Sequence, residues 1–252
     1  MTTIRLATWN TKQGVAPRQK APVLWEWITR VADPDVLVLT EARVTKEGIP
    51  DGWRAIYTQG GIGGRRNYGT IIAGRGVELR RVSYRRTKRD SQYPNSATTF
   101  SVEVASQGQP QLIVIGAYGL LSDEGNGYQE LERIVQEYLD LTAEYGRERI
   151  VVAGDFNLWP RDVVPVMSEL GLVDVTGQRD DFPELLAPRG ESRIWTHKNG
   201  AKDTDGARQE LDFIFVSPDL RRDLSQIKGG VHDFPDSWDM SDHAPVVVSL
   251  GV

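Results

Sequence analysis

The sequence predicts an α/β sandwich in which two stacked β-sheets carry helices on their outer faces. Short β-rich apolar runs outnumber the segments with helical spacing. Several of these runs, including VLVLT at 36–40 and IVVAG at 150–154, are apolar at every position instead of alternating. A continuous apolar strand is covered on both faces. Two sheets packed together with helices outside would provide that cover.

The apolar runs that are expected to form strands cover residues 4–9, 36–40, 69–73, 97–104, 112–118, 150–153, 211–216 and 245–250. Helical spacing is found at 23–32 and at 127–145, and a shorter helix is expected at 161–170. In the longest helix one apolar face is expected to hold Leu131, Ile134, Val135, Tyr138, Leu139 and Leu141. The polar stretches 177–192 and 198–210 are expected to be loops.

Composition narrows the class of protein. With 39% hydrophobic and 26% charged residues, the chain resembles ordinary soluble proteins and not disordered, collagen-like or membrane-spanning ones. It has no cysteine, which excludes disulfides, thiolate metal sites, iron–sulfur clusters and a cysteine nucleophile. There is no visible targeting segment, repeat or linker, so one domain over 1–252 is expected. We expect a cytoplasmic monomer that needs neither a membrane nor an obligate protein partner.

Polar side chains stand where the expected strands meet loops. These residues are Asn10, Glu41, Tyr118, Asp155, Asn157, Asp212, Ser241, Asp242 and His243. Loop residues held on a rigid sheet often carry function. So many positions from distant parts of the chain therefore suggest one convergent site.

Each position also has a structural interpretation. Asn10 or Asp155 alone would usually be a turn residue, and Ser241 with Asp242 could be a cap or an Asx turn. Glu41 is harder to explain in this way, because a carboxylate at the end of a buried strand needs a partner or a metal. Oxygen ligands without cysteine favour Mg²⁺, Mn²⁺ or Ca²⁺ over zinc.

Six motifs, taken in this order, resemble the endonuclease/exonuclease/phosphatase superfamily, whose members include DNase I-like and exonuclease III-like enzymes. The motifs are TWN at 8–10, LTEAR at 39–43, GAY at 116–118, GDFN at 154–157, LDFIFVS at 211–217 and SDHAPV at 241–246. They span the chain from its first expected strand to its last. The resemblance implies a four-layer sandwich and metal-dependent hydrolysis of a phosphoester.

The resemblance also implies roles for the carboxylate and amide residues. Glu41, Asn10 and Asp242 would hold Mg²⁺, for which Mn²⁺ can substitute. Asp155 would activate or orient the attacking water. Asn157 would donate to the phosphate or support Asp155.

The remaining implied roles concern proton transfer and the phosphate. Tyr118 lies at the position where relatives place a tyrosine or histidine near the scissile group. His243 would contact the phosphate or act as a general acid or base, with Asp212 bonded to its other ring nitrogen to orient it and raise its pKa. Whether His243 or the aspartate of GDFN takes the proton stays open. His197 and His232 match no motif and are expected to be solvated loop residues.

Departures from the family patterns leave the substrate undetermined. Lys12, in WNTKQG, stands where many relatives carry another metal-supporting acid or amide. TEAR differs from the QE-x-K pattern of abasic-site endonucleases, and YGLLS lacks the asparagine usually found after the tyrosine. GDFNLW and ELDFIF lack the arginine- and cysteine-containing stretches of inositol polyphosphate phosphatases.

A basic segment gives the remaining indication of substrate. The net charge is −5, yet residues 61–90 carry nine basic and two acidic side chains. Arg80, Arg81, Arg85 and Arg86 lie on an expected strand, turn and strand at 77–90. They could neutralise nucleic-acid phosphates, or they could be a charged edge that prevents strand pairing.

The predicted function is therefore a Mg²⁺-dependent phosphodiesterase, a nuclease acting on DNA or RNA. One alternative is a phosphomonoesterase or a phosphodiesterase for lipids or small molecules on the same site. A catalytically inactive binding module is the alternative of another class, although the complete set of polar residues argues against it.

Overall fold

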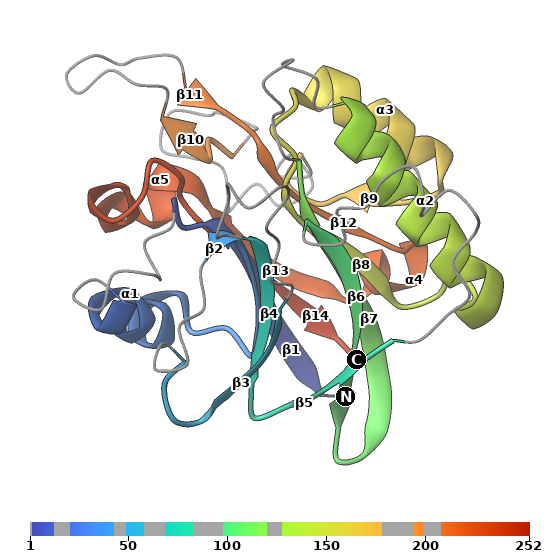
Figure 1. Cartoon of the computed structure of the whole chain (residues 1–252), viewed down its shortest axis with the longest axis horizontal. Coiled ribbons are helices and arrows are strands. Elements are labelled where there is room, and N and C mark those ends of the chain that lie inside the picture. The colour runs from blue at the N-terminus through green and yellow to red at the C-terminus, as the bar shows by residue number, and fades with distance from the viewer. Residues whose placement is uncertain are drawn as a thin grey trace, which may run out of the picture.

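The computed structural model describes residues 2–12, 21–42, 49–57, 69–82, 98–119, 128–177, 194–198 and 208–252. Within these residues two mixed β-sheets of six strands each pack face to face, and helices cover their outer faces (Figure 1). This sandwich of two sheets with helices outside confirms the predicted fold class.

The first sheet carries the two ends of the chain. Its strand order is β13 (Leu224–Gly229), β14 (Val246–Gly251), β1 (Thr3–Asn10), β2 (Val36–Ala42), β4 (Gly69–Arg75) and β3 (Trp53–Tyr57). β1 and β2 are parallel and pair Asn10 with Thr40. The carboxyl ends of these two strands therefore meet at one edge of the sheet. Thr2 and Val252 exchange backbone hydrogen bonds at the opposite end, where Figure 1 shows both termini.

The second sheet has a similar plan. Its strand order is β5 (Glu78–Arg81), β6 (Thr99–Ser106), β7 (Gln109–Tyr118), β8 (Ile150–Asp155), β12 (Asp212–Val216) and β9 (Val173–Asp174). β7 and β8 are parallel, with Tyr118 opposite Asp155. β12 is antiparallel to β8 and pairs Asp212 with the same Asp155. Three polar residues thus stand side by side at one edge.

Burial on both faces explains the continuous apolar runs. In β1, Ile4 and Leu6 pack into the core between the sheets. The alternate residues Ala7 and Trp9 pack against the helices on the outer face. Successive side chains of a strand point to opposite faces, so a strand in a middle layer needs apolar residues at every position.

Helices supply the outer layers. α1 (Ala21–Trp27) continues into the π-helical turn η1 (Ile28–Ala32) over the first sheet. α2 (Tyr128–Tyr145) and α3 (Pro160–Glu169) cover the second sheet. Leu139, expected on the apolar face of α2, is 38% exposed. That expectation was wrong because the buried face follows Leu131, Ile134, Tyr138 and Leu141, at intervals of three and four.

Several short elements were not predicted. β3, β9 and β13 are short or interrupted by polar residues, and the small segments α4 (Pro218–Arg222), α5 (Gly230–Asp233) and η6 (Pro235–Asp239) have no long period. Where a loop was expected at 198–210, β10 (His197–Lys198) and β11 (Arg208–Gln209) form a two-stranded ribbon. Two-residue polar strands leave no apolar pattern to detect.

The expected hairpin at 77–90 is only partly described. β5 is its first strand, while its turn and second strand, with Arg85 and Arg86, lie outside the described residues. Among the helices that are described, none combines the length and apolar character needed to cross a bilayer.

Candidate active site

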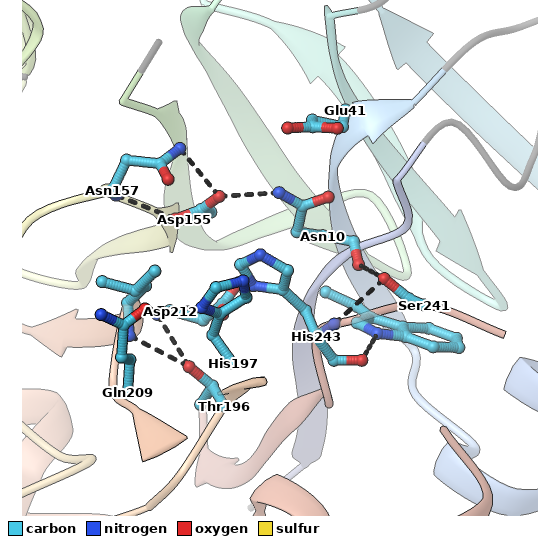
Figure 2. Close-up of polar contacts among 12 residues, drawn as sticks. Asn10, Glu41, Asp155, Asn157, Thr196, His197, Gln209, Asp212, Ser241 and His243 are labelled. Atoms are coloured by element: carbon cyan, nitrogen blue, oxygen red, sulfur yellow. Dashed lines mark hydrogen bonds and ion pairs between the residues drawn. The ribbon is translucent and has the colours of Figure 1, made fainter. Parts of the chain in front are cut away.

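The site forms where strand ends from both sheets converge (Figure 2). Asn10 ends β1 and Asp155 ends β8, and Asn10 Nδ2 donates a 2.7 Å hydrogen bond to Asp155 Oδ2. This contact joins residues 145 positions apart and connects the two sheets. Asp212 opens β12 beside Asp155, and His243 lies just before β14.

Asp155 is fully buried and held by several donors. Asn157 donates from its backbone N–H to Oδ1 at 2.9 Å and from Nδ2 to Oδ2 at 3.1 Å. Burial raises the pKa of Asp155 to about 7, and the nearby Asp212 carboxylate adds to the rise. The charge of His243 and the hydrogen bonds from Asn10 and Asn157 act to lower this pKa. The proton affinity of this carboxylate therefore suits proton exchange near neutral pH.

Close backbone packing fixes the strand end that carries Asp155. Gly154 has a φ of +156°, and a Cβ there would overlap the Ala117 carbonyl oxygen on β7. Gly119 donates its N–H to the Asp155 carbonyl at 2.7 Å. The glycine of GDFN is thus required because two parallel strands approach closely at their carboxyl ends.

His243 and Asp212 form a buried pair. His243 Nδ1 lies 2.7 Å from Asp212 Oδ2, and the two residues are 5% and 0% exposed. Burial by itself would lower the pKa of His243, but the Asp212 and Asp155 carboxylates raise it to about 9. The ring is therefore an imidazolium at neutral pH. The other oxygen, Asp212 Oδ1, is buried and has no hydrogen-bond partner among the described residues.

The end of β1 anchors the backbone around His243. Ser241 Oγ donates to the Asn10 carbonyl at 2.8 Å and accepts from the His243 N–H at 3.2 Å. Trp9 Nε1 donates to the His243 carbonyl at 2.8 Å. The turn interpretation therefore suits Ser241, whose contacts are with the backbone.

An irregularity in strand β2 sets the direction of the Glu41 side chain. The β2–β4 register shifts between Leu39 and Ala42, and Glu41 has a φ of +47°. A left-handed non-glycine residue costs about 1 to 3 kcal/mol, and such strain concentrates at functional sites. The bulge brings Glu41 Oε1 within 2.9 Å of the Tyr118 hydroxyl, which donates to it from the other sheet.

Asp242 is paired with Lys12. Lys12 Nζ lies 2.6 Å from Asp242 Oδ2, and the Lys12 N–H donates to Asn10 Oδ1 at 2.9 Å. Burial acts to raise the pKa of Asp242, but the hydrogen bond from Lys12 brings it below its usual value. Lys12 has a φ of +46° and a side chain that is 62% exposed. An exposed ion pair contributes about 0 to 1 kcal/mol, whereas a left-handed non-glycine backbone costs about 1 to 2 kcal/mol.

Two sets of residues could hold a metal. Ligand atoms of Asp155, Asp212 and His243 lie within 4.8 Å of one another. However, a histidine binds a metal through neutral imidazole, and the carboxylates keep His243 protonated. The second set, Glu41, Asn10 and Asp242, offers hard oxygen ligands, which suit Mg²⁺ or Mn²⁺. The donor chemistry thus fits a divalent cation on the second set better than on the first.

His197 lies in the site, although it was expected to be a solvated loop residue. Its ring packs on His243 with centroids 4.4 Å apart, and Nδ1 is 2.7 Å from Gln209 Oε1. Burial lowers the pKa of His197, with the His243 charge adding to the effect. The contact depends on the short β10–β11 ribbon, whose two-residue polar strands leave no apolar pattern to detect. His232 lies on α5.

The two described arginines of the basic segment lie away from this cluster. Arg80 pairs with Glu78 at 2.8 Å and with Glu103 at 3.4 Å. The guanidinium of Arg81 packs 5.7 Å from the centroid of the Phe100 ring. The structure therefore does not bring Arg80 or Arg81 together with Asp155 and His243.

The fold and this cluster together define a class of protein. In this class, two packed sheets hold carboxylates, amide side chains and a histidine imidazolium at one end of the sandwich. The endonuclease/exonuclease/phosphatase family model matches residues 7–243, and the chain belongs to that family. This family is hydrolytic, and its members depend on divalent metals.

Solved structures support the fold at low sequence identity. An AP endonuclease from Archaeoglobus fulgidus has a TM-score of 0.71 at 18% identity, covering 99% of this chain and 100% of that one. The 3′ phosphatase NExo from Neisseria, bound to a product DNA hairpin, has a TM-score of 0.67 at 19% identity, covering 99% and 100%. Truncated Caenorhabditis elegans TDP2 has a TM-score of 0.64 at 15% identity, covering 99% and 98%. No curated protein sequence matches the chain significantly.

Proposed function

We propose that the protein is a divalent-metal-dependent phosphodiesterase, a nuclease that hydrolyses DNA or RNA by attack of a water molecule on phosphorus. The observation that supports this most is the meeting of Asp155, Asn10 and the Asp212–His243 pair at one edge of both sheets. Hydrolysis needs a group that takes a proton from water and positive charge against the phosphate. The cluster contains both.

Glu41, Asn10 and Asp242 would hold the cation, Mg²⁺ or Mn²⁺. When bound, it supplies positive charge that polarises the phosphate and eases deprotonation of water. Tyr118 orients the Glu41 carboxylate through its 2.9 Å hydrogen bond. Asp242 would bind the metal as a carboxylate, and the hydrogen bond from Lys12 lowers the pKa of this group below its usual value.

Asp155 would take the proton from the attacking water. Asn10 and Asn157 fix the orientation of its carboxylate, and a pKa of about 7 balances proton acceptance against the ionised state needed at neutral pH. His243, held as an imidazolium by Asp212, would donate from Nε2 to a phosphate oxygen. Asp212 is thus a positioning residue for His243.

A nucleic acid is the favoured substrate because residues 61–90 carry nine basic side chains, which can neutralise backbone phosphates. The Tyr118 N–H donates to the Thr98 carbonyl at 2.9 Å, so the chain that follows residues 83–97 enters the second sheet beside Tyr118. Those residues include Arg85 and Arg86. The solved neighbours named above as an AP endonuclease and a DNA-bound 3′ phosphatase support the same substrate class.

The lack of cysteine supports a reducing compartment, the cytoplasm, and we treat the chain as a monomer.

One specific observation favours a second candidate, a phosphomonoesterase: the NExo neighbour is a 3′ phosphatase. The two activities differ in whether the phosphate is terminal or internal. A panel of plasmid, single-stranded DNA, RNA, 3′-phosphorylated oligonucleotide, inositol phosphates and bis-p-nitrophenyl phosphate, each with Mg²⁺ or chelator, separates them. We expect chelator-sensitive cleavage of polymers. Release of phosphate from the 3′ end alone would favour the phosphatase, and inactivity on every substrate would favour a binding module.

A salt titration tests directly whether the substrate is a nucleic-acid polymer. Replacing Arg85 and Arg86 by Ser should raise KM for the polymer and flatten the salt dependence by roughly 0.7 to 0.9 per lost phosphate contact. Arg80→Ser is the matched control, because Glu78 and Glu103 already pair with that charge. An unchanged slope in the double variant would argue for a solvated edge and remove the basic segment from the substrate site.

A further inference from the structure

His197 contacts the residue that the proposed function needs as a donor to the phosphate. Its ring packs against the His243 ring, with centroids 4.4 Å apart and 43° between the ring planes (Figure 2). Asp212 holds one edge of the His243 ring through Nδ1 at 2.7 Å. The His243 ring is thus held at one edge by a carboxylate and on one face by a second imidazole.

The backbone of the β10–β11 ribbon places the His197 ring there. Residues 197 and 243 form an antiparallel β-bridge. Beside this bridge, the Ala244 N–H donates to the Thr196 carbonyl at 2.7 Å. Thr196 Oγ also accepts from the Asp212 N–H at 3.1 Å. One short segment therefore fixes the backbone of both His243 and Asp212.

These backbone contacts do not require a histidine at position 197, because none of them uses its imidazole. The ring is half-buried, and burial lowers its pKa by disfavouring the charged form. Gln209 lies opposite on β11, and its Oε1, which can only accept, is 2.7 Å from His197 Nδ1. The side chain is therefore a neutral imidazole with its proton on Nδ1, and Gln209 sets the orientation of the ring.

A ring against the face of His243 supplies a restraint that Asp212 alone does not give. The torsion between the backbone side and the ring of a histidine is broad, so a ring held by one edge can still rock about that hydrogen bond. A misplacement of about 1 Å in a reacting group can cost roughly 10²-fold in rate. Because the second ring is neutral, it restrains the imidazolium of His243 without adding a like charge beside it.

We propose that His197 is a positioning residue: its imidazole, oriented by Gln209, packs against one face of His243 and keeps Nε2 of His243 directed at the phosphate oxygen. The inference rests on the proposed function, because it requires His243 to donate to the phosphate. The orientation of the His243 ring can also be measured without substrate, so the two proposals can fail separately.

Hydrolysis of bis-p-nitrophenyl phosphate with Mg²⁺ measures the effect on the reaction. His197→Ala should lower kcat by roughly 10 to 10²-fold with little change in KM, because the donor it misplaces acts mainly in the transition state. His197→Phe restores a ring without nitrogen atoms and should keep kcat within a few-fold of the wild type. His232→Ala, which removes a histidine from α5, is the matched control and should change neither constant.

Gln209→Leu tests the restraint on His197 itself. It removes the acceptor for Nδ1 and should lower kcat less than His197→Ala does. In the His197→Phe background the same change should have no further effect, because phenylalanine cannot donate to Gln209. The thermal midpoints should stay close to the wild-type value, since the backbone bonds of the ribbon remain. A further loss of kcat in the His197→Phe background would overturn the role of Gln209.

The proton between His243 Nδ1 and Asp212 reports on the ring in the substrate-free protein. In the wild type we expect one sharp downfield NMR signal that is lost in Asp212→Asn. His197→Ala should broaden this signal, because a rocking ring exposes the proton to exchange with water. His197→Phe should sharpen it again.

Wild-type kcat in His197→Ala, or a His197→Phe variant as slow as His197→Ala, would overturn the positioning role. An unchanged NMR signal in His197→Ala would overturn it as well, even for a wild type that hydrolyses no phosphoester. A wild type without hydrolysis, whose signal broadens in His197→Ala, would instead overturn the proposed function and support the restraint of the His243 ring by His197.

Discussion

Among the regions of this protein that bury polar residues, two differ in how the hydrogen-bonding groups of those residues are satisfied. The first, the α2 seam, lies between α2 and the start of β6 and contains Thr98, Ser101, Glu130, Arg133 and Glu137. Ser101 donates to Glu137 at 2.7 Å, Thr98 to Glu130 at 3.0 Å, and Arg133 to the Thr98 hydroxyl at 2.7 Å. Each acid of the seam therefore has a donor from a neighbouring element.

The second region, the active-site cluster, gathers like charges. Asp155 and Asp212 lie side by side at the ends of paired strands, and ligand atoms of these two acids and of His243 lie within 4.8 Å of one another. Asp212 Oδ1 is buried without a described partner. The cluster also depends on strained backbone at Glu41 and Asn157, each with a positive φ.

The difference shows which signals mark function. A raised pKa does not by itself mark a functional residue, because burial also raises the pKa of Glu130 in the α2 seam. It does so against the opposing effects of Arg133 and Thr98. The cluster combines adjacent like charges, backbone strain and a buried oxygen without a described hydrogen-bond partner. Each of these lowers the stability of the fold, and their occurrence together indicates that the residues serve a chemical function.

The sharpest test of the comparison is Asp155→Asn. The amide keeps the volume of the side chain but cannot accept a proton from water, so turnover should fall on the order of 10² to 10⁴-fold. The thermal midpoint should change little, because removal of a buried charge beside Asp212 offsets the loss of hydrogen bonds that an amide nitrogen cannot accept from Asn10 or Asn157. Steady-state kinetics and thermal melting measure the two effects. A variant that loses stability and keeps turnover would place Asp155 in the same class as the seam acids.

His243→Ala should cost nearly as much turnover as Asp155→Asn, and Asp212→Asn should cost less because Asp212 acts through His243. The double variant Asp212→Asn/His243→Ala should be as slow as His243→Ala alone. Kinetics of the three variants form a double-mutant cycle. If the losses multiply fully, Asp212 has a role separate from His243.

Glu41→Ala should abolish activity at millimolar Mg²⁺ and weaken Mn²⁺ binding, with little change in the thermal midpoint of metal-free protein, because this strand-end carboxylate contributes little packing. Tyr118→Phe removes the hydrogen bond to Glu41 and should give a smaller loss. Wild-type turnover and metal affinity in Glu41→Ala would exclude Glu41 from the site.

Much of the fold could be predicted from the sequence because buried strands need apolar residues on both faces. The runs at 36–40, 69–73 and 150–153 became β2, β4 and β8 with small extensions. The polar residues after such runs gave the outline of the site, since parallel strands end at the same edge. β3, β9 and β13 could not be found in this way, because short or partly polar strands have no clear period.

The long-range contacts of the site could not be predicted from the sequence. His197 reaches His243 only because its ribbon pairs with Gln209, and neither residue belongs to an apolar pattern. The bulge that aims Glu41 depends on its register with β4. The Lys12–Asp242 contact likewise joins the first strand of the chain to the loop before the last one.

The smallest expected effect comes from the α2 seam. Glu137→Gln keeps the side-chain size but weakens the hydrogen bond that Ser101 donates, so the free energy of unfolding should fall by about 1 kcal/mol. For a chain of this length that loss lowers the thermal midpoint by roughly 2 to 4 °C. Turnover and Mn²⁺ affinity should stay at wild-type values, because the seam shares no residue with the cluster. Ser101→Ala is the matched variant and should give a similar shift, and the double variant should fall short of the sum. If Glu137→Gln instead reduced turnover at an unchanged midpoint, the division between a structural seam and a chemical cluster would be wrong, and α2 would belong to the site.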